Sequence, residues 1–187
     1  FWTAERRMTG LNTLTATELA ALYRSGKARP SDVLAACLAC HDRVNPVLNA
    51  VIALDREGAE RAARAADARW ASGKSLSELD GVPVTVKDNL KMAGLPATWG
   101  SAAWADHRPA RDELAVWRLR DAGAVLLGKT NTPELALAGY TSNRLFGSTG
   151  NPWNPALTPG GSSGGAVASV MGGIAPLALA TDAGGSI

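Results

Sequence analysis

Apolar residues recur along this chain in two spacings, one typical of helices and one typical of strands. Several segments repeat apolar positions every three or four residues, and glycine or proline follows each of them closely. This spacing predicts helices over Thr17–Ser25, Ser31–Val44, Asp55–Ser72, Glu113–Ala122 and Ala166–Met171. Short apolar runs predict strands over Asn49–Leu54, Val82–Val86, Ala124–Leu127 and Leu177–Ala180. The alternation of helices and strands indicates an α/β fold in which helices cover both faces of a central sheet.

Local signals set the ends of these elements and the number of domains. Ser31 is the expected N-cap of the second helix, and Pro46 is expected to stop that helix after Val44. The sequence has no internal repeat, no low-complexity linker and no obvious boundary. We therefore expect a single domain over residues 1–187, with residues 1–14 as a leader or irregular start.

Composition and charge exclude several classes of protein. Hydrophobic residues make up 46% of the chain and charged residues 19%, which fits a globular protein rather than a disordered one. The net charge is only +2, without a dense basic run, so no nucleic-acid surface is expected. The most apolar stretch, Ala166 to Ala180, is too short and too interrupted to span a membrane. Phe1 to Met8 lacks the apolar core of a signal peptide, so a cytoplasmic protein is expected. Met8 is a candidate natural start, which would make Phe1 to Arg7 a leader.

The two cysteines form a motif that resembles a cofactor site. Cys37 and Cys40 precede His41, which matches the pattern for covalent haem attachment, and Cys-x-x-Cys also suits zinc or redox chemistry. The motif lies inside a predicted helix with its cysteines near the apolar stripe, and no second cysteine pair is present. Structural cysteines are therefore expected, with haem, metal and redox use as minor alternatives.

A second motif resembles a nucleotide-binding loop. Residues 123–130 match the P-loop pattern, with Lys129 and Thr130 at its end. A P-loop needs a flexible loop between its glycines, whereas here the four intervening residues are themselves a predicted strand. We expect a core strand whose polar end, Lys129 to Asn131, satisfies nearby loops, with nucleotide binding as a minor alternative.

Two serines and a lysine can combine into a site for acyl transfer. Ser162 and Ser186 lie in the glycine-rich segments 160–165 and 181–187, and Lys87 follows a predicted strand. Serine is a weak nucleophile until a base takes its proton, and lysine is a base only when burial or charge keeps it neutral. Each piece alone has an ordinary explanation, such as a flexible turn or a snorkelling lysine. Their joint occurrence favours nucleophilic catalysis, and successive backbone amides from Ala183 to Ser186 are candidates to bind an oxyanion.

These residues closely resemble the amidase signature family of serine amidases. The resemblance runs from about Thr15 to Ile187 and is strongest over Gly81–Asn89, Gly128–Glu134, Phe146–Pro155 and Pro159–Ile187. It implies a mixed central sheet covered by helices on both faces. It also implies a triad of Ser186 as nucleophile, Ser162 as the bridging serine after a cis peptide bond, and Lys87 as base.

The resemblance also assigns the residues around this triad and marks two departures. It implies an oxyanion hole from the amides of Ala183, Gly184, Gly185 and Ser186, with Ser163 and Asp182 at supporting hydrogen-bonding positions. Ala166 stands where the family often has serine, and Ile187 precedes a usual arginine. Family members are longer, so this chain is expected to be an N-terminal portion with an incomplete sheet, inactive and aggregation-prone when produced alone.

The expected function is therefore that of a serine amidohydrolase. Such an enzyme cleaves the C–N bond of a small linear amide through an acyl-enzyme, giving a carboxylate plus ammonia or an amine. No metal or cofactor is expected, and the sequence leaves open whether the protein forms a homodimer. The alternative is the A subunit of a tRNA-dependent glutamyl amidotransferase, and a non-catalytic module that kept the loops is a third. Thr132-Pro133 resembles the stand-alone amidases, since the A-type subunit usually has Met-Asp there.

Overall fold

The computed structural model describes residues 10–187. The candidate start at Met8 and the candidate leader Phe1 to Arg7 lie outside the described residues. Of the expected irregular start, Leu11–Thr13 form a short 3-10 helix, η1.

Every helix and strand expected from the hydrophobic pattern is present, within a few residues of its predicted bounds. The helices are α1 (Ala16–Arg24), α2 (Pro30–Leu48), α3 (Arg56–Ala71), α4 (Leu114–Asp121) and α5 (Gly164–Met171). The strands of the main sheet are β1 (Val51–Leu54), β2 (Pro83–Lys87), β3 (Val125–Thr130) and β6 (Leu177–Leu179). The pattern did not predict the 3-10 helices η2 (Ala102–Trp104) and η3 (Glu134–Ala136), or the short strands β4 (Ser142–Asn143) and β5 (Gly147–Ser148).

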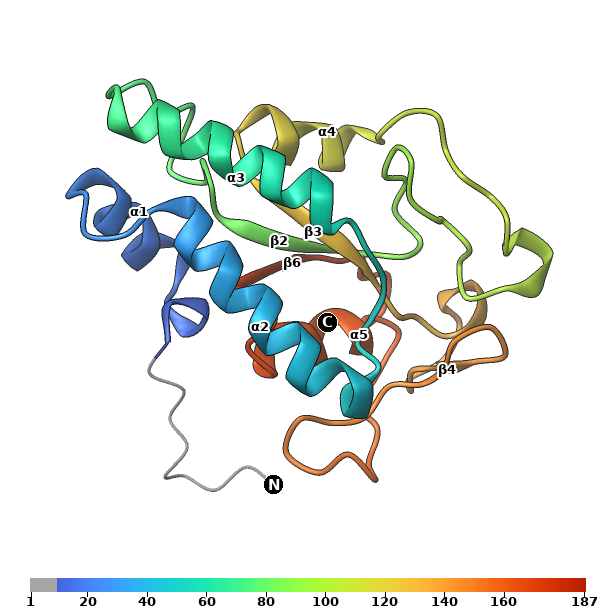
Figure 1. Ribbon diagram of the computed structural model, residues 1–187. Helices are drawn as coiled ribbons and strands as arrows, with labels where there is room; N and C mark the ends of the chain where they lie inside the picture. Colours follow the sequence, from blue (N-terminus) through green and yellow to red (C-terminus); the bar gives the residue numbers. More distant parts are fainter. Residues whose placement is uncertain (1–9) are drawn as a thin grey trace.

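The main sheet is mixed, as the resemblance implied. Its strand order is β1-β3-β2-β6, with β1 antiparallel to β3. Strand β2 is parallel to both β3 and β6, which lie beside it in Figure 1. Strand β2 therefore lies inside the sheet, and the residues at its carboxyl end are enclosed by neighbours on both sides.

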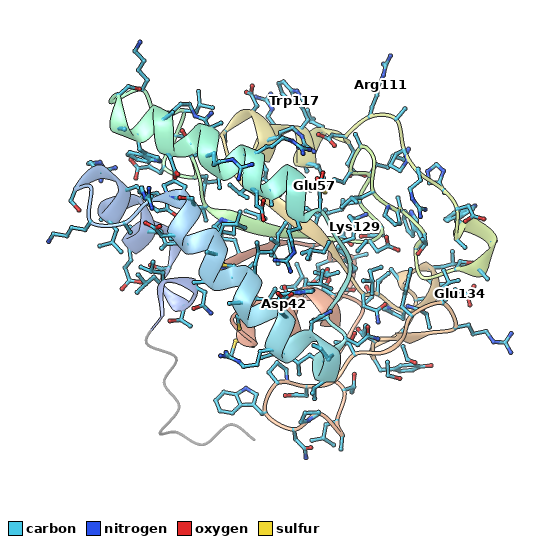
Figure 2. All side chains as sticks on the ribbon, in the orientation of Figure 1. Asp42, Glu57, Arg111, Trp117, Lys129 and Glu134 are labelled. Atoms are coloured by element: carbon cyan, nitrogen blue, oxygen red, sulfur yellow. The ribbon has the colours of Figure 1, made fainter. Side chains whose placement is uncertain are left out.

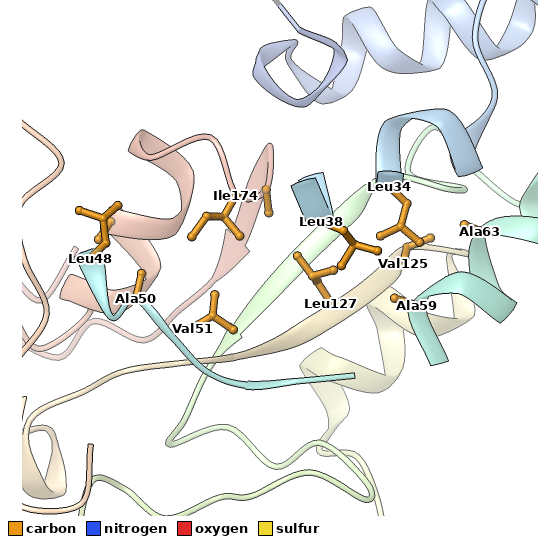
Figure 3. Packing of buried hydrophobic residues seen from close by; sticks show 12 residues of the cluster. Leu34, Leu38, Leu48, Ala50, Val51, Ala59, Ala63, Val125, Leu127 and Ile174 are labelled. Atoms are coloured by element: carbon orange, nitrogen blue, oxygen red, sulfur yellow. The ribbon is translucent and has the colours of Figure 1, made fainter. Parts of the chain in front are cut away.

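Helices cover both faces of this sheet. Val125 and Leu127 of β3 pack against α2 and α3, forming the largest part of the core (Figure 3). Leu126, between them, packs instead with Val116 of α4. Because successive side chains of a strand point to opposite faces, α4 lies on the face opposite α2 and α3. Helix α5 shares the face of α2, since its Ala168 belongs to the same cluster.

The predicted ends of α2 were wrong at both termini. Arg29 is the N-cap and Pro30 is the first helical residue, where its missing N–H costs nothing, so Ser31 lies inside the helix. Pro46 does not stop the helix, which continues to Leu48 and ends at Asn49 in the left-handed conformation (φ 48°). Near its C-terminal end a proline removes only one helical hydrogen bond.

An irregularity in β2–β3 pairing decides which way two lysines point. The register shifts between Val84 and Thr85, after which Val86 pairs with Lys129. Paired neighbours project to the same face, so Lys129 lies on the face of Val86 and of α4. Lys87, one residue after Val86, projects to the opposite face, toward α5.

Candidate active site

Lys87 is held at the carboxyl end of β2, with no exposed surface. Its Nζ lies 2.8 Å from Ser162 Oγ, 2.9 Å from Ser163 Oγ and 3.2 Å from the carbonyl oxygen of Thr181. Ser162 Oγ in turn lies 2.9 Å from Ser186 Oγ. The amine and the two hydroxyls that the sequence singled out thus form one continuous hydrogen-bonded chain.

The loop that carries Ser162 is held by the ends of neighbouring elements. Thr132 Oγ1 donates to the carbonyl of Ser162 at 3.0 Å, and Thr141 Oγ1 donates to the carbonyl of Gly160 at 2.8 Å. A Cβ on Gly165 would lie 2.4 Å from the backbone nitrogen of Asn131. Glycine is required there because α5 begins against the backbone that follows β3.

The peptide bond between Gly161 and Ser162 is cis, at the position that the resemblance implies. Immediately after it, the Ser163 amide donates to the Ser186 carbonyl at 3.0 Å. This contact ties the two serine-bearing segments together, although 22 residues separate them in the sequence. The bridging serine therefore faces the amine on one side and the second serine on the other.

Burial favours the neutral form of Lys87. Loss of solvent lowers the pKa of its amine to about 8, and the negative charge of Asp182 opposes this shift. Two of its three partners are hydroxyls, which can donate as well as accept hydrogen bonds. A neutral Lys87 can therefore donate to Thr181 and Ser163 while it accepts the hydroxyl proton of Ser162.

Three of the four amides expected to form an oxyanion hole, those of Gly184, Gly185 and Ser186, bind Asp182 in this arrangement. The backbone N–H groups of Gly184, Gly185 and Ile187 donate to the carboxylate of Asp182. The Ser186 amide has the largest effect, and together with these three bonds it lowers the pKa of Asp182 to about 2. Asp182 thus shapes the turn that presents Ser186, and any oxyanion at Gly184 or Gly185 would compete with this carboxylate.

A second buried lysine lies on the other face of the sheet. In Figure 2, Lys129 lies inside the molecule, whereas Arg111 points outward. The Nζ of Lys129 donates to the carbonyls of Leu90 and Pro96, both at 2.7 Å, and to the Asp88 carbonyl at 3.3 Å. The carboxylate of Asp88 lies 3.5 Å away. Lys129 therefore satisfies nearby loops at the polar end of β3, as predicted.

The fold also accounts for the two motifs that resemble a nucleotide-binding loop and a cofactor site. Residues 125–130 of the P-loop match are the strand β3, so their backbone pairs with β1 and β2. Cys37 and Cys40 are free, buried thiols in α2, and burial raises the pKa of Cys37 to about 12. Among residues 10–187, no three His, Cys, Asp or Glu side chains gather in a way that could hold a metal ion. No helix within the same range is long and apolar enough to cross a bilayer.

Sequence reasoning missed several residues that support the site. Thr181 and Asn89 were given no role, and Thr132 was noted only as a mark of the stand-alone amidases, although each contacts the lysine, the serines or a partner of theirs. Their signal was weak, since an isolated threonine or asparagine after a strand has many ordinary uses. Only their position beside Lys87 and Ser162 distinguishes them.

Comparison with known proteins gives a consistent family. The amidase family model matches residues 32–187. The A subunit of glutamyl-tRNA(Gln) amidotransferase from Salinispora arenicola (strain CNS-205) is 46% identical over 180 residues, covering 96% of this chain and 37% of that protein. An acylamidase from Rhodococcus erythropolis is 43% identical over 177 residues, covering 95% and 37%. A crystal structure of an amidase superposes with a TM-score of 0.86 at 36% identity, covering 93% of this chain and 40% of that one.

These similarities extend over nearly the whole of this chain but only part of its relatives. The chain spans about 37% of the length of the curated relatives it matches. The residues that the family model matches, 32–187, include Lys87, Ser162 and Ser186. The chain therefore belongs to the amidase family.

Proposed function

We propose that this protein contributes the catalytic centre of an amide-cleaving enzyme, in which Ser186 is the nucleophile. The observation that carries this proposal is the chain from Lys87 Nζ through Ser162 Oγ to Ser186 Oγ, with steps of 2.8 and 2.9 Å. A hydroxyl nucleophile, a relay and a buried amine in hydrogen-bond contact are sufficient for acyl transfer.

These three groups can carry out every proton transfer that the reaction needs. Ser186 Oγ attacks the amide carbonyl and passes its proton to Ser162 Oγ, while the Ser162 proton moves to the neutral amine of Lys87. When the C–N bond breaks, the same relay returns one proton to the leaving nitrogen. Water then attacks the acyl ester, releasing the carboxylate and restoring Ser186.

The Ser186→Ala variant of the full-length protein tests this assignment. We expect ammonia or amine release from a panel of amides to fall to background, and a fluorophosphonate to label the unchanged protein at Ser186. Labelling at Ser162 or Ser163 would move the nucleophile to that residue. Intact loops with no labelling and no turnover would instead support a non-catalytic module.

A second candidate is the A subunit of a tRNA-dependent amidotransferase. The 46% identity to a protein of that name favours it, whereas Thr132-Pro133 was expected to favour a stand-alone amidase. Both candidates cleave an amide at the same serine, so they differ in partners and in the fate of the ammonia. Copurification of partner proteins, with glutamine as the preferred amide, would select the amidotransferase, and turnover of aryl amides by the isolated protein would select the amidase.

A further inference from the structure

Asn89 lies two residues after Lys87 and makes a contact that the reaction outlined above does not use. The residue is only 8% exposed, and its Nδ2 donates to Thr181 Oγ1 at 2.8 Å. The contact joins the turn after β2 to the segment after β6. This hydrogen bond therefore connects the strand that carries the amine with the segment that leads to Ser186.

Thr181 connects the hydrogen bond of Asn89 to the proton relay. While its hydroxyl receives Asn89, its carbonyl accepts hydrogen bonds from Lys87 Nζ at 3.2 Å and from Ser163 Oγ at 3.1 Å. Residues 182–185, which follow, are exposed. The Asn89 bond thus fixes the Thr181 side chain just before the chain enters an exposed turn.

The direction of the Lys87 lone pair depends on that carbonyl. A neutral amine has two N–H bonds and one lone pair, and the two bonds must point at Thr181 and Ser163 if the lone pair is to face Ser162. If the Thr181 backbone moved, the amine would lose the carbonyl that accepts one of these two N–H bonds. We infer that Asn89 is a positioning residue, which acts through Thr181 to aim Lys87 at Ser162, an inference that rests on the proposed function.

The other end of the Asn89 amide supports a role beyond packing. Its Oδ1 is buried and, among the described residues, accepts no hydrogen bond. A buried acceptor without a partner destabilises the fold, and an apolar side chain of similar size would avoid that cost. Packing alone therefore does not account for asparagine here, whereas the donor group that reaches Thr181 does.

The charges around Lys87 limit what else Asn89 could do. Asp182 raises the pKa of Lys87, and the ion pair of Asp88 with Lys129 lies on the other face of the sheet. Asn89 is uncharged, so replacing it by leucine leaves these charges in place. A positioning role therefore predicts a lower rate with little movement of the midpoint of the pH profile.

A double-mutant cycle in the full-length protein tests this inference. The readouts are the rate of fluorophosphonate labelling at Ser186, and kcat and KM for an aryl amide. Asn89→Leu and Thr181→Val should each slow labelling about tenfold, the equivalent of one hydrogen bond, with kcat reduced and KM unchanged. The double variant should be no slower than the slower single variant, because both changes remove the same contact.

Two further variants serve as rescue and control. Thr181→Ser keeps the hydroxyl and should label within about twofold of the unchanged protein, a difference smaller than one hydrogen bond. Asn12→Leu removes another buried asparagine, whose Nδ2 donates to the Gly173 carbonyl at 2.8 Å away from the serines, and should also leave labelling unchanged.

The possible failures of the two proposals are distinguishable. Additive effects in the cycle, or normal labelling of Asn89→Leu, would overturn the role of Asn89 while leaving Ser186 as nucleophile. If the unchanged protein is not labelled at Ser186, the proposed function is wrong, and so is the role of Asn89 that rests on it. If Asn89→Leu does not fold, the labelling rates of Thr181→Val and Thr181→Ser are compared instead. Equal rates for those two variants would refute a role of the Asn89–Thr181 hydrogen bond.

Discussion

Lys87 and Lys129 lie near the ends of neighbouring strands, and both are completely buried. Loss of solvent lowers the pKa of each amine to about 8. Their partners differ in kind. Lys87 meets two hydroxyls and one carbonyl, whereas Lys129 meets three carbonyls and the carboxylate of Asp88.

This difference separates a candidate base from a structural cation. Carbonyls and carboxylates only accept hydrogen bonds, so a neutral Lys129 would lose a donor and leave the charge of Asp88 uncompensated. Hydroxyls can reverse their direction, so a neutral Lys87 keeps a full set of bonds. Burial alone therefore does not make a lysine reactive, and the donor or acceptor character of its neighbours decides.

Replacing Lys87 by methionine should have the largest effect on activity. We expect kcat to fall by about 10³-fold or more, within the usual range for loss of a general base. The folded-state pKa lies below that of an unfolded lysine, so the charge of Lys87 opposes folding, fully below pH 8 and less as the pH rises toward 10. Urea titrations should show the variant gaining stability relative to the unchanged protein as the pH falls from 10 to 8. Activity retained by Lys87→Met or by Lys87→Arg, whose guanidinium stays charged, would refute the base.

Replacing Lys129 by methionine should have the opposite signature. The change leaves Asp88 charged and buried without its cation, which typically costs about 3–5 kcal/mol of the free energy of unfolding. Asp88 keeps its hydrogen bonds from Thr98, so a second change, Asp88→Asn, should recover part of the loss. Urea denaturation of the single and double variants measures both effects. A single variant as stable as the unchanged protein would show that Lys129 holds no essential charge.

The pH profile offers a smaller but direct measurement of Lys87. Because the reaction needs the neutral amine, kcat/KM should rise with pH and level off above a midpoint near 8. Below that midpoint the rate should fall about tenfold per pH unit, the slope of a single titrating group. Under conditions where Lys129→Met is folded, its kcat/KM should rise with pH around the same midpoint. A profile that is flat from pH 6 to 9 would contradict the assignment.

Asp182→Asn should produce the smallest change. The negative charge of Asp182 raises the pKa of Lys87, so its removal should lower that pKa and move the midpoint of the profile to lower pH. Asparagine still offers one oxygen to the amides of Gly184 and Gly185, so the turn is expected to persist. Rates of the variant across the same pH range test the direction. An unchanged midpoint, or a shift to higher pH, would contradict an effect of the Asp182 charge on Lys87.

The hydrophobic pattern alone located the α-helices and the strands of the main sheet, because periodicity reports burial directly. Its errors lie where local geometry overrides a general rule. Pro30 and Pro46 both sit inside α2, one at the first turn and one in the last, where a proline is tolerated. The motif residues Lys87, Ser162 and Ser186 were also evident in the sequence, since glycine-rich loops around serines are distinctive.

The family resemblance selected Lys87, but the hydrophobic pattern by itself does not determine which lysine faces the serines. Lys87 and Lys129 both follow apolar, strand-like runs, and a one-residue shift in the pairing of β2 with β3 sends them to opposite faces of the sheet. Asn89 and Thr181 meet across 92 positions, and the amides of Gly184 and Gly185 turn to Asp182. The sequence by itself determined the residue types, the element order and the family. Register and long-range contact, which depend on how the whole sheet packs, decided the partners of each amine and hence its chemistry.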